Sequence, residues 1–165
     1  QERGSGTMEL LLTSPVSMTE IVLGKYLGLM GYLLTLVMAV GILPLLLFTG
    51  GTLDVGLYLA GMLALTLMIG ALGAGGLFVS TLTRHPPVAA IGTLGLSLSL
   101  WILGSSVKTD AGAIGGVLGY LALGPHFNAM VNGLVDSYDV AYFCLLVVGF
   151  LCLSISRLHA YRLGG

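Results

Sequence analysis

Long uncharged stretches alternate with short polar segments along this sequence. Runs free of Asp, Glu, Lys and Arg cover residues 26–53, 55–83, 86–107 and 140–156. A bilayer core about 30 Å thick is crossed by roughly 20 apolar helical residues. At these lengths a helix is the structure that satisfies its own backbone in lipid. The pattern therefore predicts four membrane-spanning helices, at about 20–49, 54–81, 86–107 and 139–158.

Helix-starting signals stand at the beginning of these runs. Ser17 and Glu20 form the S-x-x-E pattern of a capping box before the first span. Asp54 is a preferred N-cap residue for the second span. The remaining signals are Pro86 and Pro87 in the first turn of the third span, Asp136 or Asp139 as the cap of the fourth, and Pro44, which predicts a kink in the first.

A fifth uncharged stretch, residues 111–135, is interpreted as outer re-entrant or interfacial helices. Its apolar part, residues 111–123, is only 13 residues long and rich in glycine, and Gly124 and Pro125 are expected to end it. That length is too short for a span. His126 begins a more polar segment and is interpreted as a capping or hydrogen-bonding residue, not as a metal ligand.

The basic residues decide between four spans and five. With four spans, Lys108 stands alone on one side of the membrane, and the other side holds Arg3, Lys25, Arg84, Arg157 and Arg162. Cytoplasmic segments carry the excess of Lys and Arg. Both ends are therefore expected in the cytoplasm, with residues 17–158 as the transmembrane domain and residues 159–165 as a cytoplasmic tail.

Composition agrees with this interpretation and excludes several classes of protein. Of the 165 residues, 56% are hydrophobic and 8% are charged, against about 25% charged in soluble domains. The mean hydropathy is +1.04. A soluble enzyme of this size would have no place to bury so much apolar surface. The net charge of −1 and the lack of a basic cluster exclude a nucleic-acid partner. We expect an all-α polytopic membrane protein whose surroundings are the lipid bilayer.

The spans offer no catalytic chemistry. None has an ionisable residue in its interior, which disfavours ion-coupled transport. His85 and His159 fall on the cytoplasmic side and His126 on the outer side, so the histidines form no catalytic or metal-binding set. The phosphate-binding pattern GxxxxGK[ST] is absent from the sequence. We therefore expect no catalytic residue, no metal site and no cofactor bound by this chain.

Pairs of small residues occur at helical spacing in two spans. Gly24 and Gly28 form a GxxxG pattern in the first, and the second has Gly70 with Ala74 and Ala71 with Gly75. Small residues let membrane helices approach closely. Packing within one bundle and packing between subunits remain equally open at this point.

The polar segment of residues 1–16 is amphipathic and directly precedes the first span. It is expected to form a short helix along the inner membrane face, which Ser14 and Pro15 end. One interpretation is a plain interfacial anchor. The other is a docking element for a cytosolic partner.

Three stretches of the sequence resemble a known family. The run ERGSGTMELLLTSPVSMTEIVLGKYLG resembles the signature that comes after the second span of ABC-2-type transporter permeases, in their gliding-motility and nitrous-oxide-reductase-maturation branch. GLFVSTLTRHPPVAA is similar to that family's loop between its fourth and fifth spans. PHFNAMVNGLVDSYDVAYF is similar to its pattern before the last span. The glycine-rich residues 111–119 depart from the family, where bulkier apolar residues are expected.

The resemblance implies a six-span domain of which this chain holds the last four. It implies that residues 1–16 are the coupling-helix segment that contacts a separate ATP-binding cassette subunit, where ATP and Mg²⁺ would bind. The matching residues are Glu2, Arg3, Ser5, Gly6, Thr7, Glu9, Leu10, Leu11, Leu12, Ser14 and Pro15. The outer-loop motif is matched by His126, Phe127, Gly133 and Asp136.

These observations leave two functions as hypotheses. In the first, the chain is an ABC-2 permease subunit in a bacterial cytoplasmic membrane, paired with a second copy or a paralogue. In the second, it is a non-transporting membrane anchor or scaffold that docks a cytosolic partner. A membrane enzyme is disfavoured because the three histidines do not form a site.

Overall fold

Five α-helices make up the regular structure of the described residues in the computed structural model. It describes residues 17–46, 54–83, 85–106 and 119–163. The helices are α2 (Met18–Leu46), α3 (Val55–Leu82), α4 (Pro86–Ser106), α6 (Leu123–Val131) and α7 (Ser137–Leu163). All but α6 are long and apolar enough to cross a membrane. These four helices overlie the four expected spans, and the all-α fold class is confirmed.

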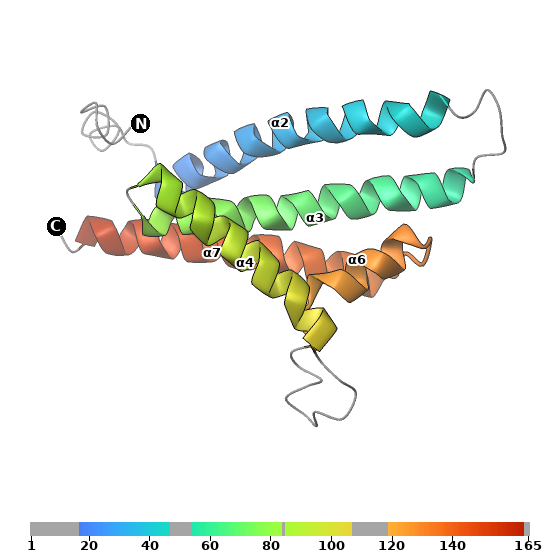
Figure 1. Ribbon diagram of the computed structural model, residues 1–165. Coiled ribbons are helices and arrows are strands. Elements are labelled where there is room, and N and C mark those ends of the chain that lie inside the picture. The colour runs from blue at the N-terminus through green and yellow to red at the C-terminus, as the bar shows by residue number, and fades with distance from the viewer. Residues whose placement is uncertain (1–16, 47–53, 84, 107–118, 164–165) are drawn as a thin grey trace.

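Helix α3 lies at the centre of the bundle and contacts all the other described helices. Figure 1 shows α2 and α3 as an antiparallel pair, with α7 alongside α3 and α4 diverging from it. The start of α2, the α3–α4 turn and the end of α7 lie together at one end, here called the proximal end. The end of α2, the start of α3 and the start of α7 lie at the other, the distal end.

Two of the predicted helix starts have the expected hydrogen bonds. The Ser17 amide donates to Glu20 Oε2 at 2.8 Å, and the Glu20 amide donates to Ser17 Oγ at 3.2 Å. This is the reciprocal capping box. Asp54 Oδ1 accepts from the amides of Gly56 and Leu57, at 3.0 and 3.2 Å. Helix α4 begins at Pro86, as its sequence predicts.

The expected end of the fifth uncharged stretch is wrong. Gly124 and Pro125 do not terminate a helix but lie in the first turn of α6. Proline is favoured there because its missing N–H has no helical partner at that position anyway. Residues 111–118 lie outside the described part, so the helix predicted for them is not described. His126 is consequently a helical residue of α6.

The core of the bundle combines small residues of α3 with large residues of α6 and α7. Ala64 and Ala71 of α3 are buried against Leu123, Met130 and Phe143. Alanine side chains allow the flanking helices to come close to the α3 backbone. This close approach lets the large side chains of α6 and α7 pack directly against α3.

The α2–α3 pair is joined by two tyrosine hydroxyls that point in opposite directions. Tyr26 of α2 donates to the Gly70 carbonyl of α3 at 3.2 Å. Tyr58 of α3 donates to the Gly41 carbonyl of α2 at 2.9 Å. Gly41 lies in the turn before Pro44, whose missing N–H weakens the local ladder of backbone hydrogen bonds. A side chain thus supplies a hydrogen bond in the turn that proline disrupts.

The two glycine patterns have different surroundings. A Cβ atom on Gly75 would lie 3.2 Å from Leu96 and 3.5 Å from Phe150. A Cβ atom on Gly24 or Gly28 would meet nothing within 4 Å. The small residues of α3 therefore serve packing within the bundle, whereas the GxxxG pattern of α2 lies on a surface that the described residues leave uncovered.

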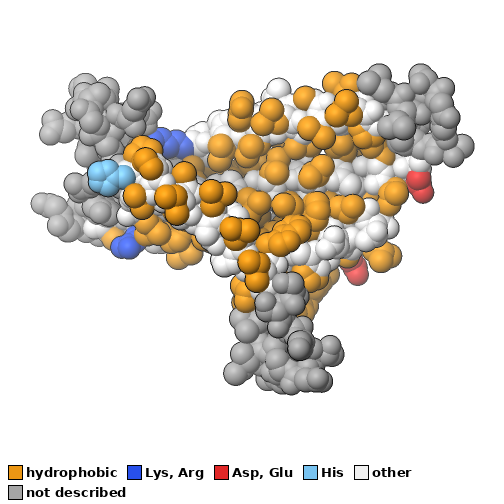
Figure 2. Space-filling model, viewed as in Figure 1, with side chains coloured by type: hydrophobic (Ala, Val, Ile, Leu, Met, Phe, Trp, Pro, Cys, Tyr) orange, Lys and Arg blue, Asp and Glu red, His pale blue; other side chains and the backbone are white. Residues whose placement is uncertain are grey.

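Side-chain chemistry is divided along the length of the bundle. On the face drawn in Figure 2, apolar side chains cover the body and the charged ones lie toward the ends. Among the described residues, Lys25 is near the start of α2 and Arg157 near the end of α7, both toward the proximal end. Asp54, Asp136 and Asp139 precede or begin helices at the distal end.

Candidate functional site

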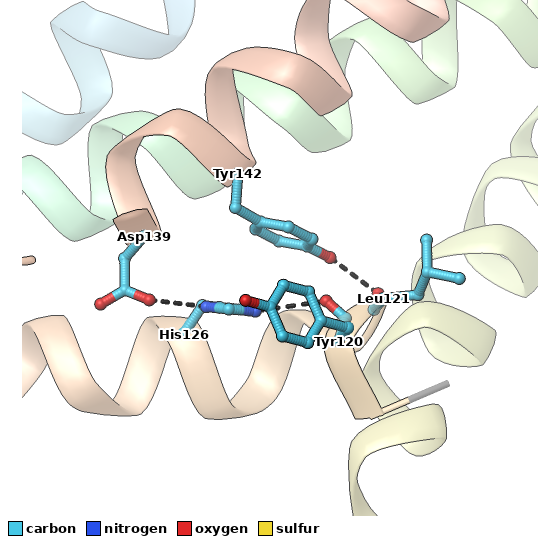
Figure 3. Close-up of polar contacts among 5 residues, drawn as sticks. All are labelled: Tyr120, Leu121, His126, Asp139 and Tyr142. Carbon is cyan, nitrogen blue, oxygen red and sulfur yellow. Dashed lines mark hydrogen bonds and ion pairs between the residues drawn. The ribbon is translucent and has the colours of Figure 1, made fainter. Parts of the chain in front are cut away.

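A cluster of polar and aromatic side chains occupies the distal end, where the chain passes from residue 119 through α6 into α7. Figure 3 shows His126, Tyr120, Leu121, Asp139 and Tyr142 converging there. Helix α6 orients the cluster, because one side of it is buried in the bundle through Leu123 and Met130. His126 is therefore directed toward the first turn of α7, which carries Asp139. We call these five residues the distal cluster.

The shortest contact in the distal cluster joins His126 to Asp139. His126 Nδ1 lies 2.6 Å from Asp139 Oδ1, and the two side chains are 11% and 10% exposed. The other ring nitrogen, Nε2, lies 3.2 Å from the carbonyl oxygen of Tyr120. A carbonyl only accepts, so Nε2 donates. A hydrogen bond joins Nδ1 to the Asp139 carboxyl group at this distance, since two facing lone pairs would repel each other.

Tyr142 completes the distal cluster from the next turn of α7. Its ring stacks on the His126 imidazole, with centroids 4.2 Å apart and 20° between the planes. Its hydroxyl donates to the Leu121 carbonyl at 2.7 Å. Side chains of α6 and α7 thus satisfy two consecutive carbonyls, those of Tyr120 and Leu121, in a segment that has only a short stretch of helix. Free carbonyls near a bilayer would be costly.

Tyr120 and one further tyrosine, Tyr138, form the exposed layer of this end. The rings of Tyr120 and Tyr138 meet edge to face, with centroids 5.3 Å apart and planes at 90°. They are 54% and 47% exposed. Tyrosine is enriched at membrane–water interfaces, where its ring contacts lipid and its hydroxyl contacts water. An exposed tyrosine pair at this end of the bundle is consistent with such an interface.

A tight turn returns the chain from α6 toward α7. Gly133 has φ +86°. Its amide donates to the Met130 carbonyl at 3.0 Å, and the Leu134 amide donates to the Ala129 carbonyl at 3.1 Å. These two bonds define a Schellman motif, whose left-handed position favours glycine. The turn sets the spacing between α6 and α7 that lets His126 reach Asp139.

The structure brings part of the predicted outer-loop motif together. His126 is in the distal cluster, and Gly133 is in the turn. Phe127 faces the other way, partly buried against the core, with its ring 6.1 Å from that of Trp101. Asp136 is exposed, and its backbone carbonyl accepts from the Asp139 and Val140 amides at the start of α7.

Sequence reasoning missed the partners of His126. The sequence pattern marks Asp139 as a possible helix cap. In the structure its side chain is buried and hydrogen-bonded to His126. An ionisable residue in the first turn of a span is itself a signal, because such residues pair with one another. Tyr142 lies at helical spacing from Tyr138 and carried no signal. The backbone carbonyls of Tyr120 and Leu121 are invisible in a sequence pattern.

The predicted coupling-helix segment lies outside the described residues. This holds for all its named members: Glu2, Arg3, Ser5, Gly6, Thr7, Glu9, Leu10, Leu11, Leu12, Ser14 and Pro15. The described chain begins at Ser17, whose capping box fixes the start of α2 at the proximal end.

The polar groups of the distal cluster bond to one another and to the backbone. Among the described residues, no group of three or more His, Cys, Asp and Glu side chains is placed to hold a metal ion. Within that same part of the chain, every buried polar side-chain atom has a hydrogen-bond partner. Two serines of α4 also bond to their own helix: Ser97 donates to the Thr93 carbonyl and Ser99 to the Leu96 carbonyl, both at 2.8 Å.

Comparison with known proteins gives one match. Residues 1–159 match the family model described as ABC-2 family transporter protein. No curated protein and no solved structure matches the chain.

Proposed function

The chain belongs to the ABC-2 family of transporter proteins, and we propose that it is a permease subunit driven by a separate ATP-binding cassette subunit. The observation that carries the proposal is the family match over residues 1–159, which includes all four candidate spans. The chain is thus a multi-pass membrane protein and an ABC transporter permease. The energy source, the partner proteins and the orientation in the membrane are proposals.

The proposed energy input is mechanical. The sequence has no GxxxxGK[ST] pattern, so ATP and Mg²⁺ would bind in the partner subunit. Residues 1–16 precede α2 in the sequence, and the capping box at the start of this 29-residue helix would transmit a displacement of the segment to it. Closure of two ATP-binding subunits would move these segments and rock the bundles between two states.

The proposed location is a bacterial cytoplasmic membrane with the proximal end in the cytoplasm. The basic residues Lys25 and Arg157 lie toward the proximal end together with the acidic Glu20, and the three acidic residues Asp54, Asp136 and Asp139 lie at the distal end. An excess of positive charge marks the cytoplasmic side of a membrane protein. This orientation places residues 1–16 where a cytosolic ATPase can contact them.

The proposed assembly is a dimer with a second copy or a paralogue. The α2 edge formed by Gly24, Gly28 and Gly31 would admit a Cβ atom at each position without contact. None of the 18-residue hydrophobic window of α4 is buried inside the bundle. A single chain therefore leaves two helices with little packing, as expected for a subunit that associates with others in the membrane.

Co-purification tests the proposal. The full-length protein, tagged and extracted in mild detergent, is expected to bring down the ATP-binding cassette protein encoded beside it, in a fixed ratio. The complex is expected to hydrolyse ATP faster when reconstituted in vesicles made from the native lipid extract. Failure to associate would overturn the permease proposal. A stable complex whose ATPase rate never responds to native membrane components would favour the anchor or scaffold function instead.

A further inference from the structure

The imidazole of His126 connects helix α6 to two other parts of the chain. Its Nδ1 atom lies 2.6 Å from Asp139 Oδ1 in the first turn of α7, and its Nε2 atom lies 3.2 Å from the Tyr120 carbonyl oxygen, before α6. Figure 3 shows the ring between these two oxygen atoms. Helix α6 packs more extensively on α3 and α4 than on α7. A change in the protonation of this ring therefore acts directly on the weaker of its helix contacts.

The two contacts of the ring together require two protons. The Tyr120 carbonyl has only lone pairs, so Nε2 carries a proton. A second proton lies between Nδ1 and Asp139 Oδ1, on one atom or the other, because two facing lone pairs would repel each other. A neutral imidazole carries one proton and a carboxylate carries none. The geometry therefore holds one proton more than a separate neutral imidazole and carboxylate would.

The pair is largely buried but not sealed from water. The side chains of His126 and Asp139 are 11% and 10% exposed, so water can deliver and remove a proton. Loss of one proton leaves a bare Nδ1 facing the carboxylate or a bare Nε2 facing the carbonyl. Burial makes either arrangement costly, because water has little room to replace the missing donor.

Imidazole is the group of this cluster that titrates near neutral pH, since its unperturbed charge change falls between about pH 5 and 8 and those of phenols and carboxylates do not. The described part of α4 has no titratable side chain, and that of α3 has Tyr58, whose hydroxyl donates to Gly41 of α2. The other titratable groups around the pair are those of Tyr120, Tyr138 and Tyr142, whose rings contact the imidazole, and of the exposed Asp136 before α7.

We propose that His126 and Asp139 form a proton-dependent latch between α6 and α7. With both protons present, the imidazole bonds to Asp139 and to the Tyr120 carbonyl. When the pH rises and one proton leaves to water, repulsion replaces one of these bonds and α6 loosens from α7. The stability that the pair contributes is thus present at the acidic end of the imidazole range and is lost as the pH rises. The inference concerns contacts within this chain and does not depend on the permease proposal.

Asp139→Asn is expected to reverse this pH dependence. An amide group donates as well as accepts, so asparagine can donate to a bare Nδ1 and keep both contacts of a neutral imidazole. At acidic pH the same variant leaves a charged imidazole without a carboxylate, which is unfavourable in a buried position. The wild type is therefore favoured over the variant at acidic pH, and this advantage shrinks as the pH rises.

Denaturant titration of the purified full chain in detergent micelles measures this advantage at several pH values. The readout is the unfolding equilibrium constant of Asp139→Asn divided by that of the wild type, in which the titration of all shared groups cancels. The ratio is expected to fall by up to about tenfold for each pH unit between about pH 5.5 and 8.5, the effect of one proton.

Asp136→Asn is the matched control. It makes the same chemical change three positions earlier, where the side chain is exposed. Its unfolding equilibrium constant, divided by that of the wild type, is expected to stay constant over the same pH range.

Trp101 reports the position of α6 in the wild type alone. It is the one tryptophan in the sequence, and its ring lies 6.1 Å from that of Phe127 in α6. Under native conditions, its fluorescence emission is expected to change as the pH rises and to return when the sample is acidified again. In Asp139→Asn the corresponding change is expected on acidification instead.

Three outcomes would overturn the latch. A ratio for Asp139→Asn that does not vary with pH would show that the pair holds no extra proton. An equal fall for Asp136→Asn would assign the effect to carboxylate charge in general. Trp101 emission that stays constant while the ratio changes would show that α6 keeps its position when the proton leaves.

Discussion

The imidazole of His126 and the carboxylate of Asp139 are 2.6 Å apart, although 13 positions separate them in the sequence. The contact joins α6 to the first turn of α7 at the distal end. The Gly133 turn and the stacking of Tyr142 on the imidazole hold both groups in place. A hydrogen-bonded pair is the form in which ionisable groups are tolerated near hydrocarbon.

Removing the carboxylate is expected to destabilise the bundle. Asp139→Ala should lower the free energy of unfolding by about 2–4 kcal/mol, because the His126 N–H stays buried and loses its acceptor. Denaturant titration in micelles, monitored by far-UV circular dichroism, measures the change. His126→Ala and the double variant complete a cycle with an expected coupling of about 1–3 kcal/mol. Additive losses would show that the two side chains do not interact.

The turn after α6 is expected to require glycine. Gly133→Ala should cost about 1–2 kcal/mol, since φ is +86° and other L residues avoid this region. The new Cβ atom would also lie 3.3 Å from Leu57. Gly133→Asn should cost less, because asparagine tolerates the left-handed region.

The matched control for the turn is Gly61→Ala in the middle of α3. Its Cβ atom meets nothing within 4 Å, and alanine stabilises a helix relative to glycine by up to about 1 kcal/mol. The melting temperature should therefore fall for Gly133→Ala and hold or rise for Gly61→Ala. Equal responses would contradict the Schellman geometry.

The tyrosine hydroxyls between α2 and α3 are expected to stabilise the helix pair. Tyr58→Phe should lower the unfolding free energy by about 1 kcal/mol, the usual contribution of one such hydrogen bond. Tyr26→Phe should cost less, since its bond is longer, at 3.2 against 2.9 Å. Tyr32→Phe is the control, because that ring is 65% exposed on α2. A loss as large in the control would assign the effect to lipid contact.

The two glycine patterns are expected to respond differently to leucine. Gly75→Leu should cost about 1–3 kcal/mol, because its side chain has to displace Leu96 and Phe150. Gly28→Leu should leave the stability of the single chain intact, since that edge is open. If the α2 edge contacts a second subunit, Gly28→Leu should reduce self-association in analytical ultracentrifugation. Unchanged association would exclude this edge as the dimer interface.

Charge reversal in the N-terminal segment is expected to separate ATP hydrolysis from transport. Glu9→Lys puts a positive charge into the proposed docking segment, so the complex should form weakly or hydrolyse ATP without a response to native membrane components. Asp110→Lys makes the same change in the segment expected on the other side of the membrane and should leave coupling intact. Coupling that is normal in both variants would remove Glu9 from the contact with the ATPase.

Much of the fold was predictable because the thickness of the bilayer sets the length of a spanning helix and its hydrocarbon excludes charged side chains. The four spans, the Ser17–Glu20 capping box and the Asp54 cap arise from local pattern, and each is present. The error at Gly124 and Pro125 is also local in origin. Glycine and proline are typical of helix starts as well as of helix ends. Whether Gly124 and Pro125 begin or end a helix depends on whether the residues that follow them are helical.

The distal cluster was predictable in its residues but not in its contacts. His126 and Asp139 are both prominent in the sequence, yet their pairing depends on the turn at Gly133 and on the burial of α6 against α3. An open groove between α3, α4 and α6 depends likewise on the divergence of two helices that each look like an ordinary span. Neither feature gives a regular spacing of residues that could be recognised in the sequence.

The sequence by itself determined the four described helices that are long and apolar enough to cross a membrane, and it contains no GxxxxGK[ST] pattern, because hydrophobic length and motif content are properties of consecutive residues. Only the tertiary structure decided which glycines lie against neighbouring helices, which histidine bonds to an aspartate and where the helices leave a groove between them. Those outcomes depend on distances between helices, which arise when apolar faces far apart in the chain pack against each other.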